Sequence, residues 1–378
     1  MFLWKTFHHM KLLLGFVLLI SCQQICAQQP KPPRNIFIIT TDGFRWEELF
    51  KGADSLLIGN PEYVRDTLLT KQMFWDETPE LRRQKLMPFF WNVIAHQGQI
   101  YGNRLFNNKA NVKNFYKISY PGYNEILTGF ADPILIPNTP KENKNTNVLE
   151  YLNNQESFKG KVAAFSSWDI LPFILNEQRS GFVVNSGYEM LDEEDKLDAL
   201  INTVQKNVTK KNNTRNDMLT YVSAREYIEQ HHPRALFLGL GETDEYAHHG
   251  RYDLYLQKAA AFDKMLAELW YFVQTDPFYK NNTTFIITTD HGRGKQGSSW
   301  RNHGFWIQGS GEVWLAMLGP DILPSGEIKD PQQLWQKQIA ATAALLVGEQ
   351  FNSEHTTGSP IILPTVKKTS NIAPSISK

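Results

Sequence analysis

The stretch that decides the fold is Phe285-Ile286-Ile287-Thr288-Thr289-Asp290-His291-Gly292, in which an apolar run leads directly to an adjacent Asp and His. A short apolar run of this kind, bounded by a turn residue, is typical of a buried strand. Open α/β sheets bind their ligands at the carboxyl ends of such strands. The stretch therefore predicts a strand that delivers Asp290 and His291 to the functional edge of a sheet.

Two other parts of the chain repeat this pattern of an apolar strand followed by an acidic residue. The run 37–41 is followed by Asp42, and the run 236–240 is followed by Asp244 and then by His248. One Asp at the end of a strand is more often a helix cap or a turn residue than a ligand. Three strand ends of the same kind instead predict one metal site. Its candidate ligands are Asp42, Asp244, His248, Asp290, His291 and His303.

The composition supplies a scaffold for such a site. The chain has 378 residues, of which 42% are hydrophobic and 12% aromatic, so it can bury a large core. Helical patterns, the clearest over 252–272 and a last one from Gln332 to Leu346, alternate with candidate strands. These strands lie near residues 35–41, 161–166, 181–185, 235–240, 283–289 and 312–318. We therefore predict an α/β fold with a doubly wound, mainly parallel central sheet and helices on both faces.

The first 27 residues have the pattern of a secretory signal. Two lysines precede the apolar run 12–20, which is too short for a permanent membrane span. Two cleavage sites stay open. The sequence Leu19-Ile20-Ser21-Cys22 resembles a bacterial lipobox, in which Cys22 would carry a lipid anchor, whereas cleavage after Ala27 would release a soluble protein. We expect an exported protein, periplasmic or extracellular, whose mature part has no cysteine, so that its metal ligands must be His and carboxylate side chains.

The remaining chain divides into a linker, a domain and a tail. Residues 28–34 read as a polar linker, residues 35–350 as the domain that carries the site, and residues 351–378 as a C-terminal tail. Residues 50–90 break the alternation of strands and helices. We interpret them either as an insertion near the mouth of the site or as a segment with a purely structural role. The 39 basic and 39 acidic residues balance, so the chain as a whole has no charge that would attract a nucleic acid polymer.

Ser119 is the candidate nucleophile. It lies in Lys117-Ile118-Ser119-Tyr120-Pro121-Gly122-Tyr123-Asn124, where Pro121 and Gly122 suit a turn that opens a short helix. A helix N-terminus offers backbone N–H groups to a phosphate or sulfate oxygen, so a serine there would lie beneath the incoming anion. The alternative is that Ser119 is only the N-cap of the helix.

Taken in order, these motifs resemble the alkaline phosphatase superfamily, and most of all its type I phosphodiesterase and nucleotide pyrophosphatase branch. The resemblance spans about residues 35–348 and rests on Asp42, Ser119-x-Pro121, Asp244-x-x-x-His248, Asp290-His291-Gly292 and His303-Gly304. It implies two divalent metal ions, expected to be Zn²⁺, with Mn²⁺ as the alternative. By this resemblance, Asp244, His248 and His303 would hold one ion. Asp42, Asp290 and His291 would hold the other, and Ser119 would bind to that second ion.

The resemblance also implies an activity, which is hydrolysis of a small-molecule phosphate ester through a covalent phospho-Ser119 intermediate. The expected enzyme is a phosphodiesterase or nucleotide pyrophosphatase. The backbone N–H of Tyr120 and the side-chain amides of Asn124 and Asn138 are candidates for binding a non-bridging substrate oxygen. Arg293 is interpreted either as a phosphate contact or as a supporting or surface residue.

Three alternatives remain. Many phosphodiesterase relatives carry Thr at the nucleophile position, so Ser119 also fits a phosphomonoesterase. A sulfatase fits less well, because the sulfatase signature has Arg where this chain has Tyr123, and because His291 and His303 would have no role in it. A non-catalytic protein that keeps metal for stability would have no need of Ser119.

Overall fold

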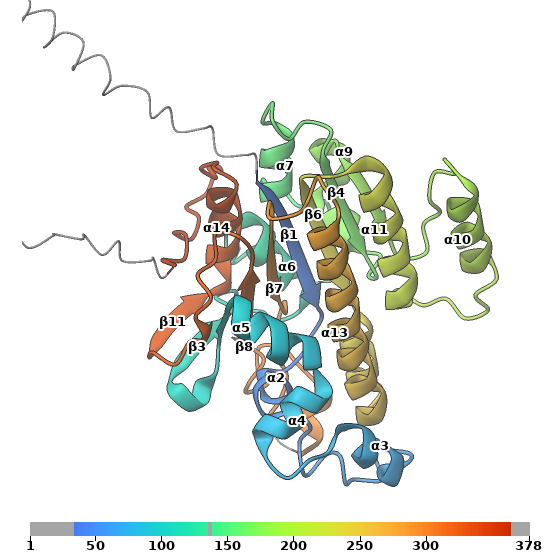
Figure 1. Ribbon diagram of the computed structural model, residues 1–378, viewed down its shortest axis with the longest axis vertical. Coiled ribbons are helices and arrows are strands. Elements are labelled where there is room, and N and C mark those ends of the chain that lie inside the picture. Colours follow the sequence, from blue (N-terminus) through green and yellow to red (C-terminus); the bar gives the residue numbers. More distant parts are fainter. Residues whose placement is uncertain (1–33, 135–137, 296, 364–378) are drawn as a thin grey trace, which may run out of the picture. The chain divides into compact units, whose positions relative to one another are not determined.

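An eight-stranded sheet forms the centre of the fold (Figure 1). Strands β7, β1, β6, β4 and β5 run parallel, whereas β9 is antiparallel to its neighbours β2 and β7. A second sheet has three strands, in the order β11 (Gln332–Trp335), β3 (Asn108–Asn111) and β8 (Glu312–Val313). In the central sheet the order is β10 (Gly326–Glu327), β2 (Gln99–Tyr101), β9 (Leu315–Leu318), β7 (Thr283–Thr288), β1 (Asn35–Thr41), β6 (Ala235–Leu240), β4 (Val162–Ser166) and β5 (Val183–Ser186).

The structure is a computed structural model that describes residues 34–134, 138–295 and 297–363, all within one compact unit, Arg34–Lys378. The predicted signal segment, with Cys22, and the linker up to residue 33 lie outside the described residues, as does the predicted tail from residue 364 onward. Within the described part of the chain, no helix has the length and apolar character that crossing a membrane requires.

The central strands are apolar on both faces because helices cover both faces. Side chains alternate along a strand, so Phe37 and Ile39 of β1 belong to one buried cluster, and Ile36 and Ile38 belong to the other. The first cluster includes residues of α11 (Asp217–His231) and α13 (Tyr252–Thr275). The second includes residues of α6 (Ser119–Thr128), α7 (Val148–Asn153) and α14 (Ile339–Leu346). The predicted doubly wound α/β fold is confirmed.

Shorter helices complete the two layers. Figure 1 shows α10 at the margin, beside α11, and α3 below the end of α13. These elements are α2 (Trp46–Lys51), α3 (Thr67–Phe74), α4 (Pro79–Leu86), η1 (Phe90–Ile94), α5 (Ala95–Gln97), η2 (Arg104–Phe106), α8 (Leu171–Leu175), α9 (Glu177–Ser180), α10 (Lys196–Lys206), α12 (Glu242–His248), η3 (Gly297–Arg301) and η4 (Gln336–Gln338).

Two predicted elements differ from the structure. The single strand expected over 312–318 is two strands, β8 and β9, which belong to different sheets. The helix expected from Gln332 begins only at Ile339, because residues 332–335 form β11 and pair in parallel with β3. Pairing with a distant strand here overrides a local pattern that is compatible with a helix.

Two predicted segments are more tightly integrated than the sequence indicated. In the segment 50–90, Leu57, Tyr63 and Phe74 belong to the main core cluster, so its aromatic content serves packing. Residues 351–363, which were expected to be tail, also pack on the domain. There the N–H of Ile361 donates to Thr342 Oγ1 at 2.9 Å, and the buried Ile361 side chain joins the second cluster. The described residues up to 363 therefore pack as part of the folded domain.

Candidate metal centre and active site

The proposed ligands meet because three neighbouring parallel strands end at the same level. In the sheet register, Thr41 of β1 lies beside Leu240 of β6, and Thr40 lies beside Thr288 of β7. Asp42 directly follows β1, and Asp290 and His291 follow β7. Asp244 and His248 lie on α12, which starts just after β6. This is the strand edge at which α/β sheets place their ligands.

Helix α6 brings Ser119 to this edge. Ser119 is the first residue of the helix and Ile118 is its N-cap, so the interpretation of Ser119 as only an N-cap is wrong. The helix approaches the backbone after β7 so closely that a Cβ added to Gly122 would lie 2.5 Å from the carbonyl oxygen of Asp290. As a result, Ser119 Oγ lies 3.3 Å from His291 Nε2, in a site where Ser119 is only 6% exposed.

Asp42, Asp290 and His291 form a first buried cluster. His291 Nδ1 lies 2.9 Å from the carbonyl oxygen of Gly292, to which it donates, so the other ring nitrogen, Nε2, presents a lone pair. That atom is 3.4 Å from Asp42 Oδ1 and 3.4 Å from Asp290 Oδ2, and within the described part of the chain neither carboxylate oxygen has a hydrogen-bond partner. Three electron-rich atoms turned toward one another, of which the two carboxylate oxygens have no donor among the described residues, fit a bound cation.

Electrostatics within this cluster also fit a bound cation. Burial, together with the charges of Asp290 and Asp244, raises the pKa of Asp42 well above its ordinary value. Burial also raises the pKa of Asp290, although His291 opposes the shift. In the absence of metal the cluster therefore tends to hold protons that a divalent ion would displace.

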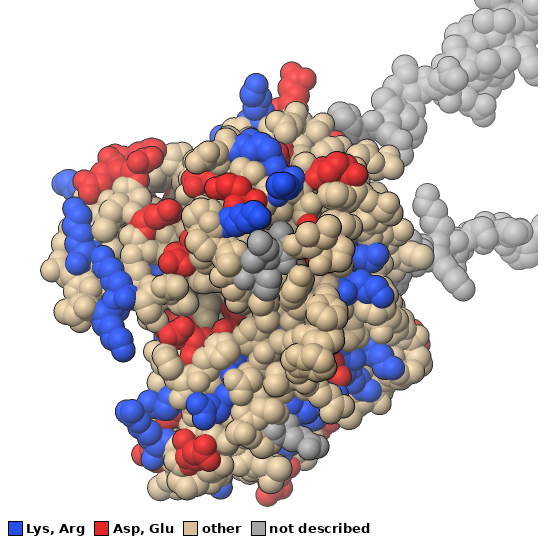
Figure 2. Space-filling view, turned by 180° about the vertical axis from the view of Figure 1, so that it is seen from behind, with Lys and Arg blue, Asp and Glu red and all other residues tan. Residues whose placement is uncertain are grey.

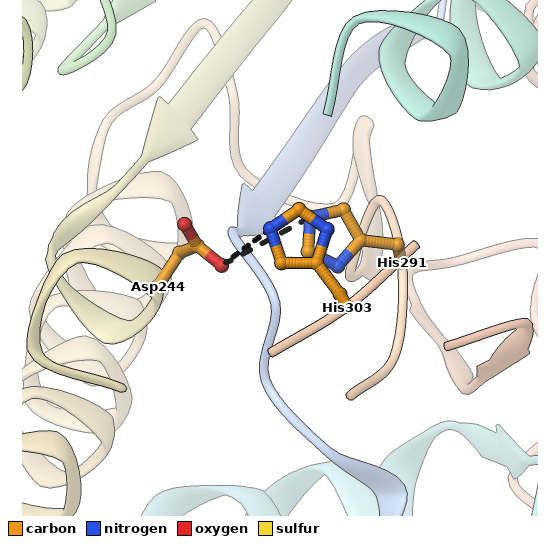
Figure 3. Close-up of side chains that lie close together, drawn as sticks. All are labelled: Asp244, His291 and His303. Atoms are coloured by element: carbon orange, nitrogen blue, oxygen red, sulfur yellow. Dashed lines mark ion pairs between the residues drawn. The ribbon is translucent and has the colours of Figure 1, made fainter. Parts of the chain in front are cut away.

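The predicted ligands Asp244, His248 and His303, the second cluster, lie next to the first. Asp244 and His303 also group with His291 as possible ligands of one ion, and His248 lies beside that group. His248 Nε2 lies 3.1 Å from Asp244 Oδ2 and 3.0 Å from His303 Nε2. His303 Nε2 is 3.7 Å from Asp244 Oδ1, and the His303 ring stacks on that of His291 with centroids 3.8 Å apart. Figure 3 shows both imidazoles directed at the Asp244 carboxylate, whose Oδ1 is 4.0 Å from His291 Nε2. The two clusters therefore adjoin one another through Asp244.

The backbone supports the orientation of His303. Its Nδ1 lies 3.4 Å from the carbonyl oxygen of Lys117, a residue held at a φ of 55°. A lysine rarely adopts this left-handed conformation, and such strain is common at functional sites. Burial and the neighbouring His291 lower the pKa of His303 well below its ordinary value, a shift that favours the neutral form of the ring that metal binding requires.

Arg293 lies inside the candidate metal centre and does not face solvent. Its Nη1 donates to Asp244 Oδ1, while its Nε and Nη2 donate to the carbonyl oxygens of Trp300 and Arg301. Burial alone would raise the pKa of Asp244, but Arg293 and His303 outweigh that effect and hold it well below its ordinary value. Of the two roles considered from the sequence, the supporting one matches this geometry.

A cavity of about 160 Å³ opens onto both clusters. Asn138 lines it, and Asn138 Oδ1 accepts the N–H of Tyr120 at 2.9 Å, so two of the predicted oxyanion donors contact each other beside Ser119. Asn124 does not reach the cavity, because its buried amide donates to Phe130 and accepts from Asn143 and Asn145. No residue of the segment 50–90 lines it. The lining residues are Asp42, Ser119, Asn138, Trp168, Asn213, Thr214, Gly241, Asp244, Glu245, His248 and His303.

Comparison with known proteins agrees with this architecture. The sequence between residues 107 and 303 matches the metalloenzyme superfamily. The chain belongs to this superfamily. Curated proteins give no match. The predicted relationship to alkaline phosphatases is thus confirmed at the level of the superfamily and the fold.

Three solved structures illustrate the fold. Wild-type alkaline phosphatase PafA has 11% identity, covers 88% of this chain and 99% of its own, and superposes with a TM-score of 0.57. The lipoteichoic acid synthase LtaP from Listeria monocytogenes has 12% identity, with 84% and 72% covered and a TM-score of 0.54. The 2-O GAG sulfatase BT1596 has 13% identity, with 86% and 73% covered and a TM-score of 0.51. At these identities the likeness shows the fold alone.

In this metalloenzyme, several residues that the sequence did not reveal support the candidate ligands. The Tyr123 hydroxyl donates to Asp42 Oδ2 at 3.0 Å, and Thr243 Oγ1 donates to the carbonyl oxygen of Asp42 at 2.5 Å. The Asp217 carboxylate accepts the N–H groups of Gly241 and Glu242, at the start of the helix that carries Asp244 and His248. Such contacts join residues that are far apart in the chain, so local sequence patterns do not predict them.

Proposed function

We propose that this metalloenzyme is an exported two-metal phosphoric ester hydrolase, most simply a phosphodiesterase or nucleotide pyrophosphatase, which acts through a covalent Ser119 intermediate. The observation that carries the proposal is the position of Ser119 Oγ, 3.3 Å from His291 Nε2 and beside carboxylate oxygens that have no hydrogen-bond partner among the residues that the structure describes. A serine so placed has a role that a passive metal-binding protein would not require. Export rests on the predicted signal over residues 1–27 and, for a lipoprotein, on Cys22.

The donor set fits two divalent ions. Asp42, Asp290 and His291, with Ser119, would hold one, and Asp244, His248 and His303 would hold the other. Nitrogen and carboxylate oxygen ligands without sulfur suit Zn²⁺, with Mn²⁺ as the alternative. When bound, such ions supply positive charge that favours an ionised serine and stabilises a departing oxygen.

The reaction would then proceed in two balanced steps. Ser119 Oγ attacks phosphorus and loses its proton, one ester P–O bond breaks, and the departing alcohol takes up a proton. Water then attacks the phosphorylated serine, which restores the Ser119 hydroxyl and releases the remaining phosphate group. The Tyr120 N–H and the Asn138 amide lie beside Ser119 and are our candidates for binding a non-bridging oxygen.

Charge in the cavity favours a diester over a monoester. A phosphodiester carries one negative charge near neutral pH, whereas a phosphomonoester carries up to two. Among the described residues that line the cavity, none is Lys or Arg, and Glu245 adds a further negative charge. No described lining side chain thus offers a positive charge to the second charge of a monoester, which only the metal ions would balance, and this makes phosphomonoesterase activity the second candidate.

Space beside the cavity also favours a substrate with two substituents. A second cavity of about 580 Å³ shares Thr214 and Glu245 with the first. Hydrogen-bonding side chains of Tyr188, Asn212 and His249 line it. Figure 2 shows a hollow on one face of the fold, with Asp and Glu side chains at its edge. A polar second substituent of a diester would fit there.

The test uses protein purified without residues 1–27. Its metal content is measured, together with its hydrolysis of p-nitrophenyl phosphate, bis(p-nitrophenyl) phosphate and p-nitrophenyl sulfate. We expect preference for the bis ester. Ser119→Ala should retain metal and lose turnover, while mass spectrometry of the quenched wild-type enzyme should detect the substrate's phosphoryl group on Ser119. Preference for the monoester would support the second candidate, and sulfate preference or full activity of Ser119→Ala would refute the proposal.

A further inference from the structure

Arg293 places a buried positive charge within the candidate metal centre. Its side chain is 0% exposed, and its Nη1 donates to Asp244 Oδ1. The rest of its guanidinium is held by the carbonyl oxygens of Trp300 and Arg301. Because no part of this side chain reaches solvent, it is not placed to bind a substrate from the cavity. Its charge acts instead on the ligands that surround it.

As a result, the two ligand clusters offer very different amounts of negative charge. The first contains two carboxylates, Asp42 and Asp290, and each has one oxygen that no described residue contacts by a hydrogen bond. The second contains only one carboxylate, Asp244, whose charge is already shared with Arg293. Its other members are imidazoles, and the side chain of His248 is 43% exposed to solvent.

We propose that Arg293 makes the metal centre asymmetric. One divalent ion binds tightly at Asp42, Asp290 and His291, and the second binds much more weakly at Asp244, His248 and His303, in a manner assisted by the phosphate group of the substrate. This inference rests on the proposed function for its two metal sites and for the choice of phosphate as the assisting anion.

Charge balance gives the physical reason. Three carboxylates and Arg293 carry a net charge of −2 when all are ionised, which a single divalent ion neutralises. A second divalent ion leaves a surplus of +2 in a buried site, and an anion bound beside the ions removes that surplus. Arg293 and an ion bound at Asp244 are like charges that share one carboxylate, so their repulsion should weaken binding of the second ion by at least about tenfold relative to the first.

The experiment is a competition titration of chelator-stripped protein with Zn²⁺, combined with metal analysis after gel filtration. For the wild type we expect one retained ion and a second that binds at least about tenfold more weakly. Micromolar inorganic phosphate should strengthen the second binding step and leave the first nearly unchanged. These readouts require no catalytic turnover.

Two variants separate the charge of Arg293 from its packing. Arg293→Met removes the charge and keeps most of the side-chain volume, and it should bring the second affinity closer to the first. Arg293→Lys keeps the charge and should retain the asymmetry. Thermal unfolding of both variants checks that they are folded. If Arg293→Met does not fold, the wild-type titrations with and without phosphate still test whether the two ions bind with unequal affinity and whether phosphate strengthens only the second binding step.

Two equally tight ions in the wild type would overturn this inference and leave the proposed function standing. Weaker binding of the second Zn²⁺ ion by Arg293→Met than by the wild type would also overturn this inference, since Arg293 would then serve to position the loop that carries His303. A wild type that binds no metal at all would overturn both the inference and the proposed function.

Discussion

Tyr123 offers the sharpest test of how the fold prepares the tight metal site. Its hydroxyl donates to Asp42 Oδ2 at 3.0 Å, which leaves Asp42 Oδ1 directed at His291. Burial and the charges of Asp42 and Asp290 raise the pKa of Tyr123 well above its ordinary value, so the hydroxyl keeps its proton. We predict that Tyr123→Phe leaves the ring packing intact and frees the Asp42 carboxylate to rotate.

The magnitude follows from the lost hydrogen bond. A buried hydrogen bond to a charged acceptor contributes about 1.5–3 kcal/mol. Residues that orient a metal ligand typically change metal affinity by about 10–100-fold when they are replaced, which is the same energy range. We therefore expect Zn²⁺ to bind about 10–100-fold more weakly to Tyr123→Phe at the tight site, measured by competition with a fluorescent chelator.

Tyr120→Phe is the matched control. Tyr120 lies in the same helix and is also buried, but its hydroxyl donates to the carbonyl oxygen of Lys141 at 2.7 Å, away from the ligands. Its loss should lower the free energy of unfolding by about 1 kcal/mol without altering metal affinity. Equal Zn²⁺ affinity in Tyr123→Phe and the wild type would refute the claim that this tyrosine orients Asp42.

Two further predictions concern packing and pH. Gly122→Ala puts a Cβ 2.5 Å from the carbonyl oxygen of Asp290, so it should cost about 1–3 kcal/mol in chemical unfolding and reduce activity, whereas Gly59→Ala, with nothing closer than 3.7 Å, should be nearly neutral. Burial raises the pKa of Asp263 from 3.8 to about 7, so the folded state binds the proton more tightly and this group's contribution to stability falls as pH rises through that range. Urea unfolding at pH 5 and pH 8 should show a smaller pH-dependent loss of stability for Asp263→Asn than for the wild type, and an unchanged loss would contradict the assignment.

The fold class and the candidate metal ligands could both be predicted from the sequence. In the stretches that end at Asp42, Asp244 and Asp290, an apolar run predicts a buried strand, and each run is followed by an acidic residue that can bind metal. Parallel strands in one sheet must end at one edge, so these residues could be predicted to meet without knowledge of any side-chain contact. The position of Ser119 at the start of a helix was likewise a local feature.

Tertiary structure alone decided the partners of those residues. The contact of Arg293 with Asp244, that of Tyr123 with Asp42, and the presence of Trp168 and Thr214 in the cavity all join segments distant in sequence. The short strands β2, β3, β10 and β11 were missed for the same reason, because two to four residues acquire a strand conformation only by pairing with another strand. Periodicity and turn residues record what a segment does along its own length, whereas the charge balance of a buried site depends on which segments the fold packs together.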